Sequence, residues 1–211
     1  MSTLIVGANG SMGIRYQTIF EWLSLPYWAI DKEYGRDQML SMADRADSII
    51  VCTPTITHGD LLRDLIPLGK PLLCEKPISK DMDELNELLT MAKRKSAPFN
   101  MVMQYEELLN DQGRSSNAMS EYNYFRHGND GLVFDCLQII ALAKAEVWLN
   151  DNSPVWTCTI NGQKLNLSDM DGAYIKMIKK WRAGNMHQDP AWLMEIHENA
   201  TEMNEEINEY R

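Results

Sequence analysis

The sequence lacks the features that mark membrane, secreted and metal-binding proteins. No apolar run in its 211 residues exceeds the length of a short core strand, so no membrane-spanning helix is expected. Residues 3–6 already have the character of a strand, which leaves no room for a signal peptide, and we expect the protein to remain in the cytoplasm. The four cysteines have no CxxC or histidine-rich spacing, and we interpret them as buried, reduced thiols.

The chain also has few basic residues for its acidic content. It contains 20 Lys and Arg against 30 Asp and Glu, which gives a formal net charge of −10. This charge repels phosphate backbones and anionic lipid, which argues against nucleic acid and membranes as partners. We therefore expect an ordinary globular chain.

The first half of the chain alternates short apolar strands with amphipathic helical patterns. The expected strands are 3–6, 27–30, 48–52, 71–74 and 99–103, and the helical patterns between them lie near 12–23, 36–43 and 61–66. A further helix is expected from Asp81, where Asp81 and Glu84 form a capping box. Strands separated by helices predict a parallel sheet covered on both faces. The fold class is thus predicted to be α/β, with a doubly wound Rossmann domain over residues 1–110.

Past residue 110 the pattern changes to a small α+β domain, which we predict over residues 115–211. A polar stretch, 108–120, is the expected linker. The expected strands are 121–125, 146–149, 155–160 and 163–167, with a hairpin at Asn161 and Gly162, and the expected helices are 133–143, 169–183 and 190–208. Trp148 and Trp156 on a small exposed sheet would be better covered by a second copy, so we expect a homo-oligomer.

A glycine turn follows the first expected strand. Its missing side chains let backbone N–H groups and a helix N-terminus approach a pyrophosphate. Asp31 ends the second expected strand, where a carboxylate can accept hydrogen bonds from an adenosine ribose. The predicted dinucleotide-binding residues are Gly7, Asn9, Gly10, Ser11, Met12, Gly13 and Asp31. The alternative is a plain tight turn, with Asp31 serving only as a helix N-cap.

The same acidic residue bears on the choice of cofactor. A carboxylate at Asp31 repels a ribose phosphate, whereas Lys32 and Arg36 nearby could weaken that repulsion. The predicted cofactor is NAD or NADP, with NAD favoured.

Two further loops follow the third and fourth expected strands. They read TPTITHGD at 53–60 and CEKPIS at 74–79. Together with the glycine turn, they resemble the glucose-fructose oxidoreductase, inositol dehydrogenase and MocA (Gfo/Idh/MocA) family. The resemblance implies a Rossmann domain followed by an α/β domain with an open sheet, and hydride exchange between NAD(P) and a sugar, cyclitol or related small-molecule substrate. It also implies that the reduced domain at 115–211 binds the substrate and makes the oligomer interface.

The resemblance assigns roles to the residues of these two loops. Thr53, Pro54 and His58 would line the cofactor near the nicotinamide ribose, and Glu75, Lys76 and Pro77 would form the catalytic loop. An ammonium within reach of a substrate hydroxyl stabilises the developing oxyanion or exchanges its proton. The competing interpretations are a solvated charge for Lys76 and a structural histidine at a helix N-terminus for His58.

One expected catalytic residue is missing. Family members usually carry an Asp-x-x-x-His pattern on the first helix of the second domain; this chain supplies Asp135 but has Ile139 in place of the histidine. Gln138 could orient a substrate hydroxyl but cannot exchange a proton, and Tyr124 and His127 are weaker candidates.

Three functions therefore stay open. The first is an NAD(P)-dependent oxidoreductase that relies on Lys76. The second is a catalytically lapsed, dinucleotide-binding regulatory protein. The third is a reductase of an unsaturated substrate, which needs less acid–base machinery because the proton can come from water.

Overall fold

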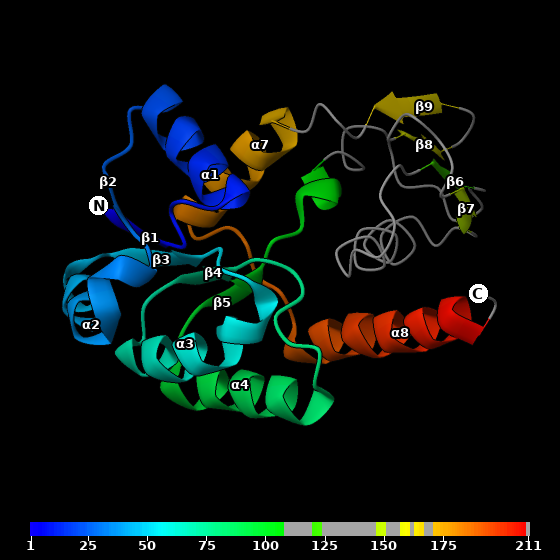
Figure 1. Cartoon of the computed structure of the whole chain (residues 1–211). Coiled ribbons are helices and arrows are strands. Elements are labelled where there is room, and N and C mark those ends of the chain that lie inside the picture. The colour runs from blue at the N-terminus through cyan, green and yellow to red at the C-terminus, as the bar shows by residue number, and fades with distance from the viewer. Residues whose placement is uncertain (108–119, 124–146, 151–156, 161–162, 167–170, 210–211) are drawn as a thin grey trace. The chain divides into compact units, whose positions relative to one another are not determined.

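Figure 1 shows the chain in a computed structural model, which describes residues 1–107, 120–123, 147–150, 157–160, 163–166 and 171–209. The chain forms two compact units. The first unit contains Met1–Val102 and His187–Met194, and the second contains Met103–Met186 and Glu195–Arg211. The N-terminal unit is therefore built from two segments that are distant in the sequence.

The first unit is organised around a five-stranded sheet in which all neighbouring strands are parallel. Its strands are β1 (Thr3–Val6), β2 (Tyr27–Ile30), β3 (Ser48–Val51), β4 (Leu72–Cys74) and β5 (Phe99–Met101), in the order β2-β1-β3-β4-β5. All five strands expected from the sequence are confirmed. The chain leaves β1 toward β2 on one side and returns to β3 on the other, so the strand order reverses at the carboxyl ends of β1 and β3.

Helices cover both faces of this sheet. Helix α1 (Ser11–Trp22) lies on one face, and α2 (Gly35–Arg45), α3 (His58–Leu65) and α4 (Met82–Lys95) lie on the other (Figure 1). Right-handed crossovers require this division, because α1 connects strands in the opposite direction along the sheet from the other three helices. Short 3-10 helices η1 (Lys32–Tyr34), η2 (Thr55–Thr57) and η3 (Ile66–Leu68) lie in the connections. The predicted doubly wound α/β fold is confirmed.

Apolar stripes on the helices form the core, as the sequence predicts. The buried residues are Leu85, Leu88, Leu89 and Ala92 on α4, and Leu62, Leu65 and Ile66 on α3 and η3. Leu61 is only half-buried. Cys52 and Cys74 are buried free cysteines, and burial raises the pKa of both thiols. The raised pKa values favour the protonated thiol over the reactive thiolate at both positions.

The start of α4 differs from the reciprocal capping box expected for Asp81 and Glu84. The Asp81 carboxylate accepts a hydrogen bond from the Glu84 N–H at 2.9 Å, as expected. The Glu84 carboxylate, however, accepts from the Ser79 hydroxyl at 2.6 Å, and the Ser79 oxygen accepts from the Asp81 N–H at 3.0 Å. Gly59 on α3 makes room for this carboxylate, since a Cβ there would lie 2.0 Å from Glu84 Oε1. The second half of the predicted box is wrong because Ser79 is inserted into it.

Among the described residues, a side chain rather than a sixth strand pairs with the outer edge of β5. Gln188 Oε1 accepts a hydrogen bond from the Met101 N–H at 2.6 Å, and Gln188 Nε2 donates to the Met101 carbonyl at 2.9 Å. Met101 is fully buried. The amide of Gln188 thus satisfies two backbone groups that an edge strand would otherwise leave unpaired.

The second unit contains a four-stranded sheet. Its strands are β6 (Ser120–Asn123), β7 (Val147–Asn150), β8 (Thr157–Ile160) and β9 (Gln163–Asn166), in the order β7-β6-β8-β9. Strands β8 and β9 are antiparallel with Ile160 opposite Gln163, which confirms the hairpin predicted between them. Strands β6 and β7 pair in parallel, so β6 separates β7 from β8.

Two helices near the C-terminus complete the description. They are α7 (Asp171–Arg182) and α8 (Pro190–Glu209), and they confirm the helices expected at 169–183 and 190–208. The helix expected at 133–143, most of the linker, Trp156 and the side chain of Trp148 lie outside the described residues. None of the helices in the described ranges combines the length and apolar character that a membrane crossing needs.

Candidate cofactor and active site

The turn between β1 and α1 packs tightly against the end of β3. Gly7 has φ +96°, a backbone conformation that residues other than glycine rarely adopt. A Cβ on Gly7 would lie 2.8 Å from the carbonyl carbon of Cys52. The N–H groups of Gly7 and Ala8 both donate to the Ile30 carbonyl, at 2.9 and 3.0 Å, so the turn is also tied to the end of β2.

The other two glycines of the turn differ in what surrounds them. A Cβ on Gly13 would lie 2.2 Å from the Gly7 carbonyl oxygen, so the close approach of α1 to the turn requires a glycine at this position. A Cβ on Gly10 would have its nearest contact at 3.5 Å, which is ordinary van der Waals distance. The fold itself therefore does not require a glycine at position 10, and Gly10 is exposed.

The N-terminus of α1 is prepared for an anion. Gly10 is its N-cap residue, no side chain caps the helix, and the first turn contains no acidic residue. The N–H groups of a first helical turn have no partner within the helix and carry the positive end of the helix dipole. Helix α3 differs, because the Glu84 carboxylate lies against Gly59 in its first turn. The residues of the glycine turn thus fit a dinucleotide pyrophosphate.

Asp31 lies directly after β2, and each of its carboxylate oxygens accepts one backbone hydrogen bond. Oδ2 accepts from the Asn9 N–H at 2.8 Å, and Oδ1 accepts from the Lys32 N–H at 2.8 Å. The second bond makes Asp31 the N-cap of η1. The Asn9 side chain donates to Glu33 Oε1 at 3.0 Å, which places a second carboxylate beside the glycine turn. A carboxylate oxygen has two lone pairs, so Asp31 can still accept a ribose hydroxyl.

Arg36 pairs with a different carboxylate from those of Asp31 and Glu33. Its guanidinium forms an ion pair with Asp64 on α3, and the Asp64 carboxylate raises the pKa of Arg36 through this hydrogen bond. The Arg36 side chain is 72% exposed. Its charge is therefore directed to α3, whereas Lys32 is exposed on η1.

His58, the first residue of α3, joins the loops that follow β3 and β4. Its side chain is buried, with Nδ1 2.9 Å from the Pro77 carbonyl oxygen and Nε2 2.9 Å from the Thr53 carbonyl oxygen. Both ring nitrogens therefore face backbone carbonyl oxygens. The imidazole thus contacts protein backbone on both sides and fastens Thr53 to Pro77.

The catalytic-loop candidates follow β4 directly. Glu75 continues the strand, since its N–H donates to the Val51 carbonyl at 2.8 Å, and its side chain is buried. Glu75 Oε1 accepts a hydrogen bond from the Tyr16 hydroxyl at 2.5 Å, and Oε2 accepts from the Lys76 N–H at 3.3 Å. Lys76 is half-buried, and the peptide bond between Lys76 and Pro77 is cis.

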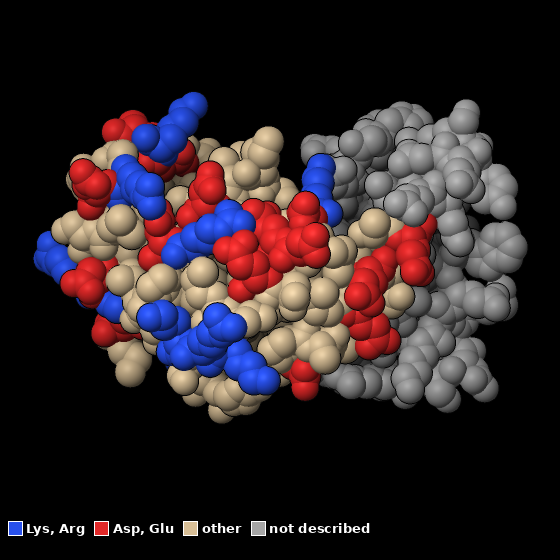
Figure 2. All heavy atoms as spheres, turned by 90° about the horizontal axis from the view of Figure 1, so that it is seen from below, with Lys and Arg blue, Asp and Glu red and all other residues tan. Residues whose placement is uncertain are grey.

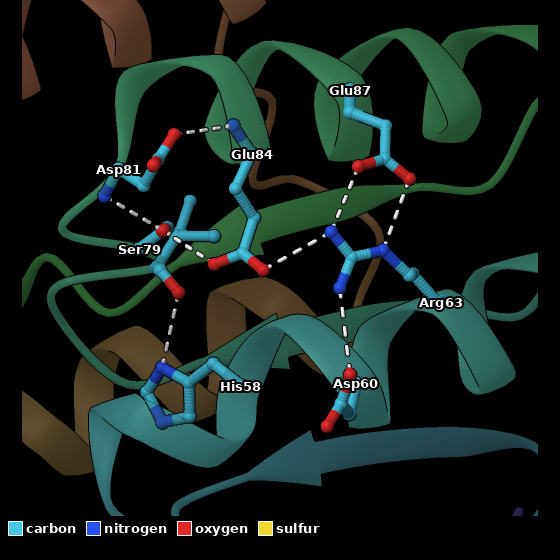
Figure 3. Close-up of polar contacts among 8 residues, drawn as sticks. His58, Asp60, Arg63, Ser79, Asp81, Glu84 and Glu87 are labelled. Atoms are coloured by element: carbon cyan, nitrogen blue, oxygen red, sulfur yellow. Dashed lines mark hydrogen bonds and ion pairs between the residues drawn. The ribbon is translucent and has the colours of Figure 1, made fainter.

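A polar network joins the end of this loop to α3 and α4. Figure 3 shows Ser79 and Arg63 pointing toward the Glu84 carboxylate, with Arg63 Nη2 3.1 Å from Glu84 Oε1. Arg63 also forms two hydrogen bonds with Glu87 at 3.0 and 2.8 Å, and an ion pair with Asp60 at 3.5 Å. The bond from Arg63 lowers the pKa of Glu87. On the face shown in Figure 2, Lys and Arg side chains are mixed with Asp and Glu.

The structure brings most of the predicted site residues to one edge of the sheet. The glycine turn, Asp31, Thr53 and Pro54, and Glu75 and Lys76 follow the carboxyl ends of β1, β2, β3 and β4, respectively. Asp135 and Gln138 lie outside the described residues, as do Tyr124 and His127. The structure adds two residues that the sequence did not single out. Tyr16 follows the glycine turn at helical spacing and looked like a core residue, and nothing in the sequence connects Glu33 to Asn9.

A doubly wound fold with this glycine turn and acidic residue defines a dinucleotide-binding Rossmann domain. Residues 3–103 match a family model described as the oxidoreductase family with an NAD-binding Rossmann fold, GFO_IDH_MocA. These residues therefore belong to the Gfo/Idh/MocA family, and the resemblance based on the two loops is confirmed.

Individual proteins of the family show the same similarity. The chain is 37% identical over 85 residues to inositol 2-dehydrogenase from Rhizobium meliloti, a match that covers 38% of this chain and only 26% of that enzyme. Solved structures also share its fold. A Gfo/Idh/MocA family oxidoreductase from Vibrio cholerae has a TM-score of 0.75 at 12% identity, covering 100% of this chain and 99% of the other. The WlbA dehydrogenase from Thermus thermophilus, in complex with NAD and UDP-GlcNAcA, has a TM-score of 0.68 at 14% identity, covering 95% and 94%.

Proposed function

We propose that this protein is an NAD-dependent oxidoreductase that exchanges a hydride with a small hydroxylated substrate such as a sugar or cyclitol. The observation that carries the proposal is the uncapped N-terminus of α1 at the exposed Gly10, on the same sheet edge as Lys76. The names of the relatives agree with it, since they include an inositol dehydrogenase and a dehydrogenase complexed with NAD and a nucleotide sugar.

Each group of residues has a distinct task in this proposal. The N–H groups at the start of α1 bind the pyrophosphate, and Asp31 accepts hydrogen bonds from the adenosine ribose. Thr53, Pro54 and His58 shape the loop beside the nicotinamide ribose, with His58 acting through the backbone because its ring is enclosed. Bound nicotinamide supplies the hydride acceptor or donor. Lys76 takes up or returns the proton of the substrate hydroxyl and stabilises the oxyanion that develops there.

Lys76→Ala tests the catalytic part of this proposal. The variant should lose turnover with sugars and cyclitols, while the Kd for NADH, followed by its fluorescence, stays within about twofold of the parent protein. Lys93→Ala, at an exposed position near the end of α4, is the matched control and should leave both quantities unchanged. Equal turnover in the Lys76 variant would remove Lys76 from its role. Dinucleotide binding by a parent protein that turns over nothing in a broad substrate panel would favour the regulatory function instead.

We further propose that NAD is preferred over NADP. Two carboxylates, Asp31 and Glu33, are held beside the turn by Asn9, and both oppose a ribose phosphate. Of the two nearby cations, Lys32 and Arg36, Arg36 is paired with Asp64, which directs its charge away from binding a phosphate. Glu33→Gln and Asp64→Asn should each improve NADPH binding relative to NADH, by on the order of fivefold. An unchanged ratio of the two dissociation constants in both variants would refute this assignment.

The remaining assignments also stay proposals. Residues 115–211 would form the domain that binds the substrate, with Asp135 and Gln138 as candidates to contact it. A homo-oligomer is proposed on the ground given for Trp148 and Trp156, and a light-scattering mass equal to a single chain would reject it. A location in the cytoplasm can be checked by fractionating the cells that produce the protein.

A further inference from the structure

We propose that Tyr16 is a positioning residue for the catalytic loop. It holds Glu75 at the end of β4, so that the side chain of the next residue, Lys76, has a fixed direction. The proposal deepens the function given above and rests on it for the catalytic meaning of Lys76. Its physical basis is independent of turnover. It lies in the hydrogen bonds around a nearly enclosed carboxylate, between a helix on one face of the sheet and the loop at the sheet edge.

Glu75 is an unusual residue to find enclosed at the end of a strand. Only 7% of its surface is exposed, and its carboxylate accepts one hydrogen bond from Tyr16 and one from the Lys76 N–H. An enclosed carboxylate requires donors, because the loss of hydration is not otherwise compensated. The shorter of the two bonds, at 2.5 Å, comes from Tyr16, whose side chain is 0% exposed. Tyr16 is thus the main donor that keeps this carboxylate in place.

Tyr16 is itself held at a defined position relative to the glycine turn. It stands one turn of α1 after Gly13, where the helix comes so close to the turn that no Cβ would fit. Helix α1 cannot shift toward the turn without a clash, which restricts the position of the Tyr16 hydroxyl beside the end of β4. The helix whose N-terminus would bind the pyrophosphate therefore also carries the donor that anchors the catalytic loop.

The same short loop is held on its other side by His58. The imidazole contacts the Pro77 carbonyl oxygen at 2.9 Å, and Tyr16 contacts Glu75 at 2.5 Å. Lys76 lies between these two anchored residues. Since a catalytic group displaced by about 1 Å loses much of its effect, anchoring both neighbours is a direct way to fix the path of the lysine side chain.

A core role alone is the competing explanation for Tyr16. It predicts that the hydroxyl matters only for the stability of the fold. The chain offers a matched control in Tyr27, whose hydroxyl also donates to a glutamate, Glu21, at 2.7 Å, but at the surface and at the amino end of β2, whereas the loop follows the carboxyl end of β4. The conversion of tyrosine to phenylalanine removes the same hydroxyl at both positions and leaves the ring in place.

The experiment compares Tyr16→Phe with Tyr27→Phe in the full-length protein. The direct readout is the rate at which acetic anhydride at trace levels acetylates Lys76, divided by the rate for exposed Lys93 and measured by mass spectrometry. We expect Tyr16→Phe to change this ratio by about threefold or more and to lower kcat by about tenfold, while the Kd for NADH stays within about twofold. Tyr27→Phe should change none of the three quantities.

The labelling ratio decides the outcome and does not depend on catalysis. If Tyr16→Phe lowers the unfolding midpoint but leaves the ratio at the parent value, Tyr16 is a core residue and the proposal is overturned, whatever the turnover. If the parent protein neither binds NADH nor turns over any substrate, the proposed function fails, while a changed ratio still supports the positioning of Lys76 by Tyr16.

Discussion

Gly10→Ala and Gly13→Ala make the same chemical change three positions apart, and the structure predicts different results for them. A Cβ on Gly13 would lie 2.2 Å from the Gly7 carbonyl oxygen and 2.7 Å from the Ala8 backbone, so α1 has to move away from the turn. A Cβ on Gly10 would meet nothing closer than 3.5 Å. Gly13→Ala therefore tests the packing of the fold, and Gly10→Ala tests what binds next to it.

The two effects on stability can be estimated. Overpacking of a close contact costs about 1–3 kcal/mol and sometimes more, and the overlap at Gly13 involves backbone atoms that cannot rotate away. With a urea dependence of about 1–3 kcal/mol per M, Gly13→Ala should lower the unfolding midpoint by roughly 1 M. Gly10 has φ −73° and ψ 165°, which alanine also adopts. Its replacement loses about 0.5–1 kcal/mol of N-cap preference and gains about as much by restricting the unfolded chain.

NADH titration and urea unfolding of the two variants separate these effects. Gly10→Ala should unfold near the parent midpoint yet bind NADH at least about tenfold more weakly, because its methyl group would stand where we propose that the pyrophosphate binds. Tenfold corresponds to about 1.4 kcal/mol. Parent-like NADH affinity in this variant would refute the placement of the dinucleotide at the glycine turn. Parent-like stability of Gly13→Ala would refute the close packing of α1 on that turn.

Two further predictions concern the first unit. Gln188→Ala leaves two buried backbone groups of Met101 without partners and should lower the free energy of unfolding in urea by about 1–3 kcal/mol. The control, Gln38→Ala at an exposed position on α2, should leave it almost unchanged. Equal unfolding midpoints of the two variants would contradict the contact between Gln188 and Met101. Arg63 lowers the pKa of Glu87 below its ordinary value of 4.5, so the stabilisation from this pair is present above that pH and is lost as the pH falls below it. Glu87→Gln should therefore unfold more easily than the parent protein at pH 7, with the difference shrinking in acid; a difference that grew in acid would show that another interaction is responsible.

Much of the first unit could be predicted from the sequence because its signals are local. Apolar periodicity marks each strand and helix by itself, and right-handed crossovers then leave few ways to arrange them. The glycine turn was recognisable for the same reason, since Gly7 and Gly13 are required by contacts within a few residues or with the adjacent strand.

The contacts of the polar side chains could not be predicted in this way. Helical spacing shows that Tyr16 faces inward, but the carboxylate it meets belongs to a loop 59 residues away. The Glu84 carboxylate binds the Ser79 hydroxyl and the Arg63 guanidinium instead of the Asp81 N–H. It can do so because Gly59 lets the carboxylate approach α3. From the sequence, Asp31 could be either a helix cap or a ligand-binding residue, whereas in the structure its carboxylate caps η1 and also accepts a hydrogen bond from the glycine turn.

The contact between Gln188 and Met101 has a consequence for how the protein can be divided. The first unit includes His187–Met194, so a fragment that ends at the linker would lack the segment that covers the free side of β5. Such a fragment would present the unpaired backbone of an edge strand, which is a template for pairing with other chains. Studies of the Rossmann domain in isolation should therefore expect self-association, and should keep the C-terminal segment or supply it as a separate peptide.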